Sequence, residues 1–124
     1  MISIKIGNSR YPLRFTLAAM DGIEETTGKT IGELNLRVKS KADRAELIAV
    51  LAVLMREGAE AGVETPTAEA LHVRMTPGEL LGSLRSVSDA ISEGMRMETE
   101  EDAEEGAEVD VVLEEIEKKG TPGD

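Results

Sequence analysis

The sequence predicts an α+β protein with an N-terminal β-hairpin, a small helical bundle of about four helices and an acidic C-terminal arm. Three observations lead to this prediction. At the start of the chain, apolar residues alternate with polar ones, which is typical of half-buried strands. From residue 17 onward they recur every three or four positions, which is typical of amphipathic helices. The acidic residues are concentrated near the C-terminus.

The charge distribution divides the chain into two parts, residues 1–97 and 98–124. The first part has thirteen Asp and Glu residues against twelve Lys and Arg, whereas the second has twelve against two. Acidic runs at a chain end are usually solvated interaction tails. We therefore expect a hairpin and helical body over residues 1–97, and an acidic linker with a short amphipathic helix over residues 98–124.

The composition limits both the core and the function classes. Tyr11 and Phe15 are the only aromatic residues and there is no Cys, so the core must be aliphatic, and disulfides, thiolate metal sites and a Cys nucleophile are excluded. The longest apolar run, residues 47–55, is far shorter than the ~20 residues that cross a bilayer, and the residues after Met1 do not form a signal-peptide pattern. Basic residues are interspersed with acids, so we expect neither a membrane nor a nucleic acid as a partner.

The first two predicted elements are strands joined by a tight turn. Residues 2–6 alternate strictly between apolar and polar, residues 10–15 do so again, and the Gly-Asn-Ser sequence between them is typical of a hairpin turn. Pro12 cannot donate a hydrogen bond to a ladder, so the second strand is an edge or Pro12 faces outward. Because a lone hairpin is marginal in water, it must lie on helices or pair with another chain.

Two helices with a turn between them are predicted next. The first, residues 17–27, starts after the cap residue Thr16, ends at Gly28 and is expected to bury a face with Leu17, Met20 and Ile23. A capping-box pattern at residues 30–33 predicts a single turn, followed by a connector over residues 34–39.

The second of these helices starts after Ser40 and is predicted to run to Ala61, with Gly62 as its end. Its segment Leu47–Met55 is apolar on every side. Such a helix is normally buried in the centre of a core, but in so small a protein one of its sides could instead contact a partner. Both interpretations stay open at this point.

Two more helices complete the predicted body. Residues 68–74 form a short one, and Thr76, Pro77 and Glu79 together give the clearest helix start in the chain. The helix that follows is predicted to reach about Met97. It carries an apolar stripe with the members Leu80, Leu84, Val87, Ile91 and Met95.

The arm itself has two predicted segments. Residues 98–108 contain seven acids and have no apolar periodicity, as expected for a linker. Val109, Val112, Leu113 and Ile116 then follow at i, i+3, i+4 and i+7, which predicts a short amphipathic helix. An isolated helix of this length is marginal in water, so it must dock on the body or on a partner.

The chain offers little catalytic chemistry. His72 is the only histidine, and the glycines form no phosphate-binding pattern. Carboxylates are abundant, but those of the arm lack a calcium-loop spacing, and those of the body are expected on solvated helix faces. We therefore expect no enzyme, no cofactor and no metal, and a function in protein binding.

Apolar helical surface is the best candidate for that binding. We expect the helix at 47–55 and the stripe at 80–95 to form either a groove or the core of the body, and the arm to supply charge and a second docking helix. The candidate partner-binding residues are Leu47, Leu51, Leu54, Met55, Leu80, Leu84, Val87, Ile91, Met95, Val109, Val112, Leu113 and Ile116.

The segment YPLRFTLAAMDGIEETTGKTIGEL, residues 11–34, combines an alternating strand, a Thr-Leu helix start, an acidic amphipathic turn, a Gly and a short turn that ends in Leu. It resembles the opening of the small tail assembly chaperones of long-tailed bacteriophages and of related tail proteins in gene transfer agents. The resemblance covers the first half of the chain by residues and the rest by organisation. The matching residues are Leu13, Phe15, Thr16, Leu17, Ile23, Glu24, Gly28, Ile31 and Leu34.

The resemblance implies a non-enzymatic protein of the host cytoplasm that is absent from the mature virion. Such a chaperone binds and solubilises the tape-measure protein and helps to recruit the tail-tube protein. It also implies that this chain is the short form of a protein that a programmed frameshift can lengthen. Two alternatives remain: a structural minor tail or connector component, whose hairpin edge would pair between copies as a homo-oligomer, and an acidic inhibitor that binds a basic protein through residues 98–108.

Overall fold

Two antiparallel strands and four helices make up residues 1–96, the part of the chain that the computed structural model describes. This is the predicted α+β architecture, with the hairpin first and the helices after it. The elements are β1 (Ser3–Ile6), β2 (Ser9–Pro12), α1 (Leu17–Thr27), the 3-10 turn η1 (Ile31–Glu33), α2 (Lys41–Gly58), α3 (Ala68–Arg74) and α4 (Pro77–Met95).

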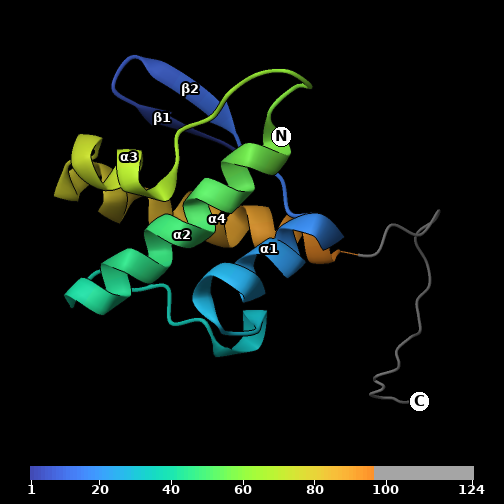
Figure 1. Ribbon diagram of the computed structural model, residues 1–124, viewed down its shortest axis with the longest axis horizontal. Helices are drawn as coiled ribbons and strands as arrows, with labels where there is room; N and C mark the ends of the chain where they lie inside the picture. The colour runs from blue at the N-terminus through green and yellow to red at the C-terminus, as the bar shows by residue number, and fades with distance from the viewer. Residues whose placement is uncertain (97–124) are drawn as a thin grey trace.

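Helix α2 is the centre of the fold. It contacts α1, α3, α4 and β2, while β1 lies against α4. In Figure 1, α2 crosses the middle of the molecule, with α1 below it, α3 to its left, α4 behind it and the hairpin above. A single, mainly aliphatic core results, with buried members from β1 and all four helices and with Tyr11 of β2 packed against it.

The hairpin lies on the helices, as one of the two predicted arrangements requires. Ile4 and Ile6 are buried against the core, and Ile6 pairs with Ser9 across a two-residue turn. Gly7 has a φ of 60°, which the first central residue of a type II′ turn needs. β2 ends at Pro12, earlier than predicted, but the amide of Leu13 still donates to the carbonyl of Ile2 at 2.8 Å.

The apolar segment of α2 is buried on all sides. Leu47, Leu51, Leu54 and Met55 are each 0% exposed, and only Ala52 within the segment is half-buried. The interpretation of this helix as the central core helix is therefore confirmed. Each fully buried Leu of this kind contributes roughly 1.5–3 kcal/mol relative to an exposed one.

The buried face of α1 includes the predicted Ile23 and the half-buried Met20, but the prediction was wrong for Leu17. Leu17 is exposed, and the buried residues are Ala19, Gly22 and Ile23. The reason is the close approach of α1 to α2, because a Cβ on Gly22 would stand 3.3 Å from a methyl of Val53. Small residues therefore mark the packed face, and the large side chain of Leu17 at the first helical position projects away from the core.

Helix α2 also ends earlier than predicted, at Gly58 instead of Ala61. Ala59 is already extended, with φ −75° and ψ 151°. A tight turn follows, in which the amide of Val63 donates to the carbonyl of Glu60 at 3.0 Å. Gly62, with a φ of 85°, serves this turn and does not cap the helix.

The predicted helix starts are confirmed by their hydrogen bonds. The hydroxyls of Thr16, Ser40, Thr67 and Thr76 each accept from the backbone amide three residues on, at 3.0–3.1 Å. Helix α3 has the predicted bounds, and α4 ends at Met95, two residues before the predicted end.

Candidate functional site

Most of the predicted partner-binding residues lie in the core. Besides the four candidates of α2, the stripe residues Leu80, Val87 and Ile91 are buried, and Leu84 is half-buried. These eight side chains pack against one another and against the hairpin, so they do not form an open groove in this structure. Val109, Val112, Leu113 and Ile116 lie outside the described residues.

Among the candidates within residues 1–96, Met95 is the one that is exposed, at 56% of its surface. It ends α4, where a Cβ on the neighbouring Gly94 would collide with the backbone carbonyl of Phe15. Two other apolar side chains are exposed on neighbouring segments. Leu17 lies two residues after Phe15. Met1 precedes Ile2, whose carbonyl accepts a hydrogen bond from the amide of Leu13.

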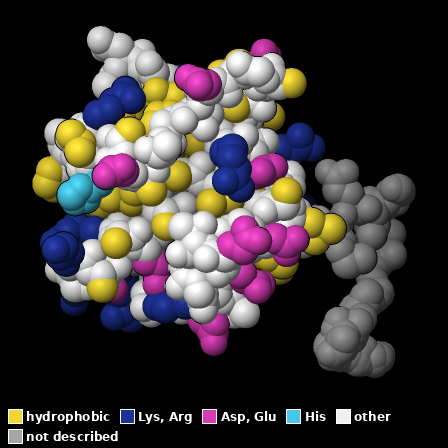
Figure 2. Space-filling view, in the orientation of Figure 1, with side chains coloured by type: hydrophobic (Ala, Val, Ile, Leu, Met, Phe, Trp, Pro, Cys, Tyr) yellow, Lys and Arg dark blue, Asp and Glu magenta, His cyan; other side chains and the backbone are white. Residues whose placement is uncertain are grey.

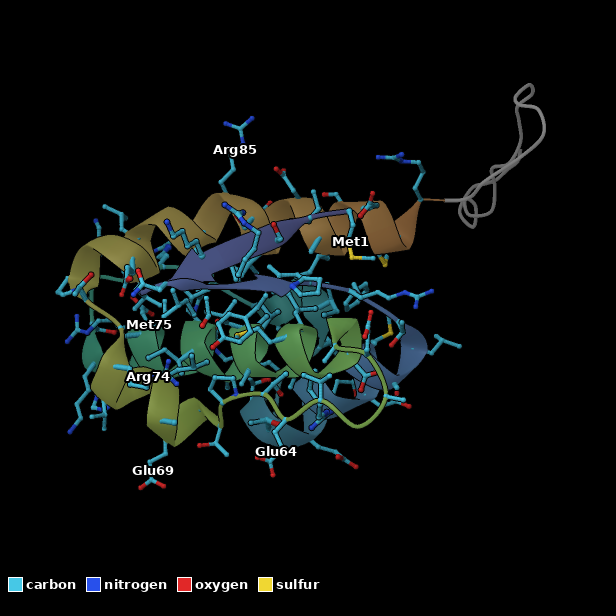
Figure 3. The ribbon with its side chains drawn as sticks, turned by 90° about the horizontal axis from the view of Figure 1, so that it is seen from above. Met1, Glu64, Glu69, Arg74, Met75 and Arg85 are labelled. Atoms are coloured by element: carbon cyan, nitrogen blue, oxygen red, sulfur yellow. The ribbon has the colours of Figure 1, made fainter. Side chains whose placement is uncertain are left out.

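We call Met1, Leu17 and Met95 the terminal patch. Figure 3 shows Met1 toward the end of the body where the described chain stops. The sequence analysis missed Met1 and Leu17 as surface residues. The available signal was the pair of small residues Ala19 and Gly22, which marks a different face of α1 as the packed one.

The opposite end of the body has a hollow of about 170 Å³ at the start of α2. Ile48, Met75 and Leu80 form apolar walls, and Arg44 and His72 stand at its side. Larger hollows lie between β2 and the 59–65 segment, about 410 Å³, and between α1, α2 and the 65–68 segment, about 270 Å³.

A buried carboxylate organises the connector between α1 and α2. Glu46, whose side chain is 9% exposed, accepts from Lys29 Nζ at 2.6 Å and from the Asn35 amide at 2.8 Å. Burial raises the pKa of Glu46, but hydrogen bonds from Lys29, Asn35 and Leu36 outweigh it and hold the pKa below its ordinary value. We call Glu46 and its donors Lys29 and Asn35 the clamp. Leu36, which follows Asn35, has a φ of 50°, an uncommon conformation for this residue type.

Two further carboxylates, the half-buried Glu79 and the exposed Glu33, have comparable structural roles. Glu79 accepts from the amides of Gly7 and Thr76, both at 3.0 Å, and so joins the hairpin turn to the start of α4. These bonds lower the pKa of Glu79, and the amide of Thr30 lowers the pKa of Glu33 in the same way. A carboxylate with a lowered pKa is a weak proton acceptor, so these groups favour a structural role over acid–base chemistry.

Within residues 1–96, His, Asp and Glu form no group that could hold a metal ion. His72 is exposed on α3 and shares its hollow with Arg44, without a carboxylate among the lining residues. The described surface has the apolar terminal patch at one end and, at the other, a hollow lined in part by Arg44 and His72.

None of the helices in the described part of the chain has the length and hydropathy that a membrane-spanning helix needs. Comparisons of the chain with protein-family models, with curated proteins and with solved structures give no match.

Proposed function

We propose that this protein is a tail assembly chaperone of a long-tailed bacteriophage, which binds and solubilises the tape-measure protein. The observation that carries the proposal is the segment 11–34 and the structural role of its matching residues. Leu13 and Phe15 are core residues, Thr16 caps α1, and Gly28 ends it with a φ of 73°. These four matching residues are ones that a related chain would need for the same passage from strand to helix.

The charges and surfaces of the chain suit the task of keeping a tape-measure protein soluble. A tape-measure protein that the tail tube does not yet enclose exposes apolar helical stripes, and a large exposed apolar surface favours aggregation. The terminal patch supplies exposed Met and Leu side chains, and Met in particular adapts to irregular apolar partners. The arm of twelve acids and two Lys adds strong negative charge, which keeps coated complexes apart.

Because the core is sealed, we assign partner contact to the terminal patch and not to the α2–α4 interface. The proposal includes the tail-tube protein as a second partner, the host cytoplasm as the site of action, and no catalytic activity or cofactor. As a chaperone, the chain is expected to be absent from purified virions. Its detection there by mass spectrometry, in stoichiometric amount, would favour a structural tail component.

Co-expression with the tape-measure protein tests the proposal. The wild-type chain should move the tape-measure protein into the soluble fraction. The double variant Leu17→Ser, Met95→Ser should lose most of this effect. The matched control Val73→Ser, Leu81→Ser also removes two exposed apolar side chains, 79% and 57% exposed, from elsewhere on the body and should keep it. Equal solubility with and without the wild-type chain would refute the proposal.

Two other functions each rest on a specific feature. Within residues 1–96 the sheet consists of β1 and β2, and pairing of an outer strand edge with another copy is what a structural tail component would require. The acidic arm favours an inhibitor of a basic protein, and strong loss of binding with salt or on removal of residues 98–124 would distinguish that function.

A further inference from the structure

The hollow at the start of α2 lies within a basic surface. Arg44, on its side, donates to the carbonyls of Val38 and Lys39 at 3.0 and 3.2 Å, which fixes the guanidinium beside the 37–41 segment. One Nη atom makes both bonds, so other N–H groups of the guanidinium remain for a ligand. The exposed basic residues of this surface are Arg37, Lys39, Lys41, Arg44 and Arg74.

Few acids offset these charges. Asp43 accepts from the amide of Ser40 in the capping box of α2, and Glu46 is held by Lys29. Glu79, beside the lining residue Leu80, is engaged by the amides of Gly7 and Thr76. Glu69, in the first turn of α3, is an exposed acid nearby. In Figure 2, Lys and Arg side chains lie beside the single His at the left edge and below it, over the start of α2. An acidic ligand with apolar side chains would therefore match both the rim and the floor of the hollow.

Such a segment occurs in the same chain. Residues 108–117 carry five acids around the apolar residues Val109, Val112, Leu113 and Ile116. The apolar side chains match walls made of Ile48, Met75 and Leu80, and the acids match the basic rim.

The length of the arm determines which of its residues can reach the hollow. Thr76 and Leu80, at the start of α4, line the hollow, whereas the arm leaves from the end of α4. Figure 3 shows Arg74 and Met75 at the opposite end of the body from the end of α4. Nineteen helical residues at ~1.5 Å each span about 28 Å. An extended chain at ~3.3 Å per residue needs about nine residues to cover this length, so only positions beyond about 105 can reach the hollow.

We propose that residues 108–117 bind to the hollow lined by Arg44, Ile48, His72, Met75 and Leu80 within the same chain. The acids at the start of the arm are too close to the end of α4 to reach the hollow, so they do not contribute to this binding. Tethering gives the segment an effective concentration in the millimolar range, so a weak electrostatic and apolar contact is sufficient. The contact covers the basic end of the body until a competing ligand displaces the arm. This inference does not depend on the proposed function.

Amide NMR spectra of the full chain test the proposal, with the chain 1–97 as the reference. The buried core residues of the described part of the chain lie between Ile4 and Ile91, so the chain 1–97 contains all of them. Signals of residues lining the hollow should differ between the two chains at low salt and coincide at high salt. Two full-length variants, matched in the number of charges removed, separate the parts of the arm. The distal set changes Glu108, Asp110, Glu114, Glu115 and Glu117 to Gln or Asn, and the proximal set changes Glu98, Glu100, Glu101, Asp102 and Glu104.

The distal variant should give the signals of the 1–97 chain around the hollow, and the proximal variant should keep those of the wild type. A further variant, Val112→Ser with Leu113→Ser, should lose most of the difference without any change in charge. Coincident wild-type and 1–97 spectra, or equal effects of the two charge variants, would overturn the proposal. Signals that change on tenfold dilution would also overturn it, because they would show that the arm binds a second copy.

Discussion

Replacement of Gly94 by Ala tests the closest approach between α4 and the start of α1. A Cβ at position 94 would meet three atoms of Phe15: its backbone carbonyl oxygen, its Cβ at 2.7 Å and its Cδ2 at 2.8 Å. The carbonyl cannot turn aside, because Phe15 directly precedes Thr16, the cap of α1, and its own side chain is buried. The two segments must therefore move apart.

The magnitude follows from two opposing effects. In a helix interior, Ala is more favourable than Gly by up to about 1 kcal/mol, and this gain fades at the last turn, where Gly94 lies. Overpacking of a tight contact costs about 1–3 kcal/mol. The expected net loss is about 1–2 kcal/mol, which lowers the midpoint of thermal unfolding by about 4–8 °C per kcal/mol.

Gly82→Ala is the matched control, because it makes the same change in the same helix with no atom within 4 Å of the new Cβ. It should stabilise the protein by up to about 1 kcal/mol. Urea unfolding followed by far-UV circular dichroism measures both variants against the wild type. Equal stability of Gly94→Ala and Gly82→Ala would show that α4 does not pack on Phe15 as described.

The remaining predictions concern the clamp, a cap and the core. Glu46→Gln should destabilise by about 1–2 kcal/mol at neutral pH, as expected for hydrogen bonds to a charged group. Because the pKa of Glu46 is lowered on folding, its contribution is present above the unfolded pKa and is lost as pH falls through the folded value. The stability difference from wild type, measured by urea unfolding, should therefore shrink in acid, and a difference independent of pH would contradict the clamp. Thr76→Ala removes the side-chain bond to the Glu79 amide and should lower the free energy of unfolding by about 1 kcal/mol, whereas an unchanged urea midpoint would contradict this cap. Leu51→Ala should cost about 2–5 kcal/mol in the same assay and Leu81→Ala, at a 57% exposed position, far less; equal losses would contradict the assigned core.

The helix starts could be predicted from the sequence because their determinants are local. A Thr or Ser cap and the residues up to three positions later are enough to place a boundary, as at Thr76 and Ser40. The end of α2 could not be predicted in this way. Ala59, Glu60 and Ala61 are all compatible with a helix, and the turn that stops it depends on how the chain returns toward the hairpin.

The sequence pattern also could not show which residues cover each apolar helix face. The periodicity of α4 identifies its apolar stripe but does not say whether a neighbouring helix or an outside partner covers it. The structure covers it with the body's own residues and leaves Met95 outside. Glu46 had no recognisable signal, because its partners Lys29 and Asn35 come from a connector whose path only the folded chain defines.

In the proposed function, the folded body binds apolar helices at its surface while its core stays closed. The most direct measurement is a titration of the protein with a helical tape-measure peptide that carries an apolar stripe, followed by amide NMR. We expect shifts near Met1, Leu17 and Met95, with the amide of Leu51 unchanged. Absence of any shift at saturating peptide would contradict the claim, and shifts throughout α2 would show instead that the core opens to bind.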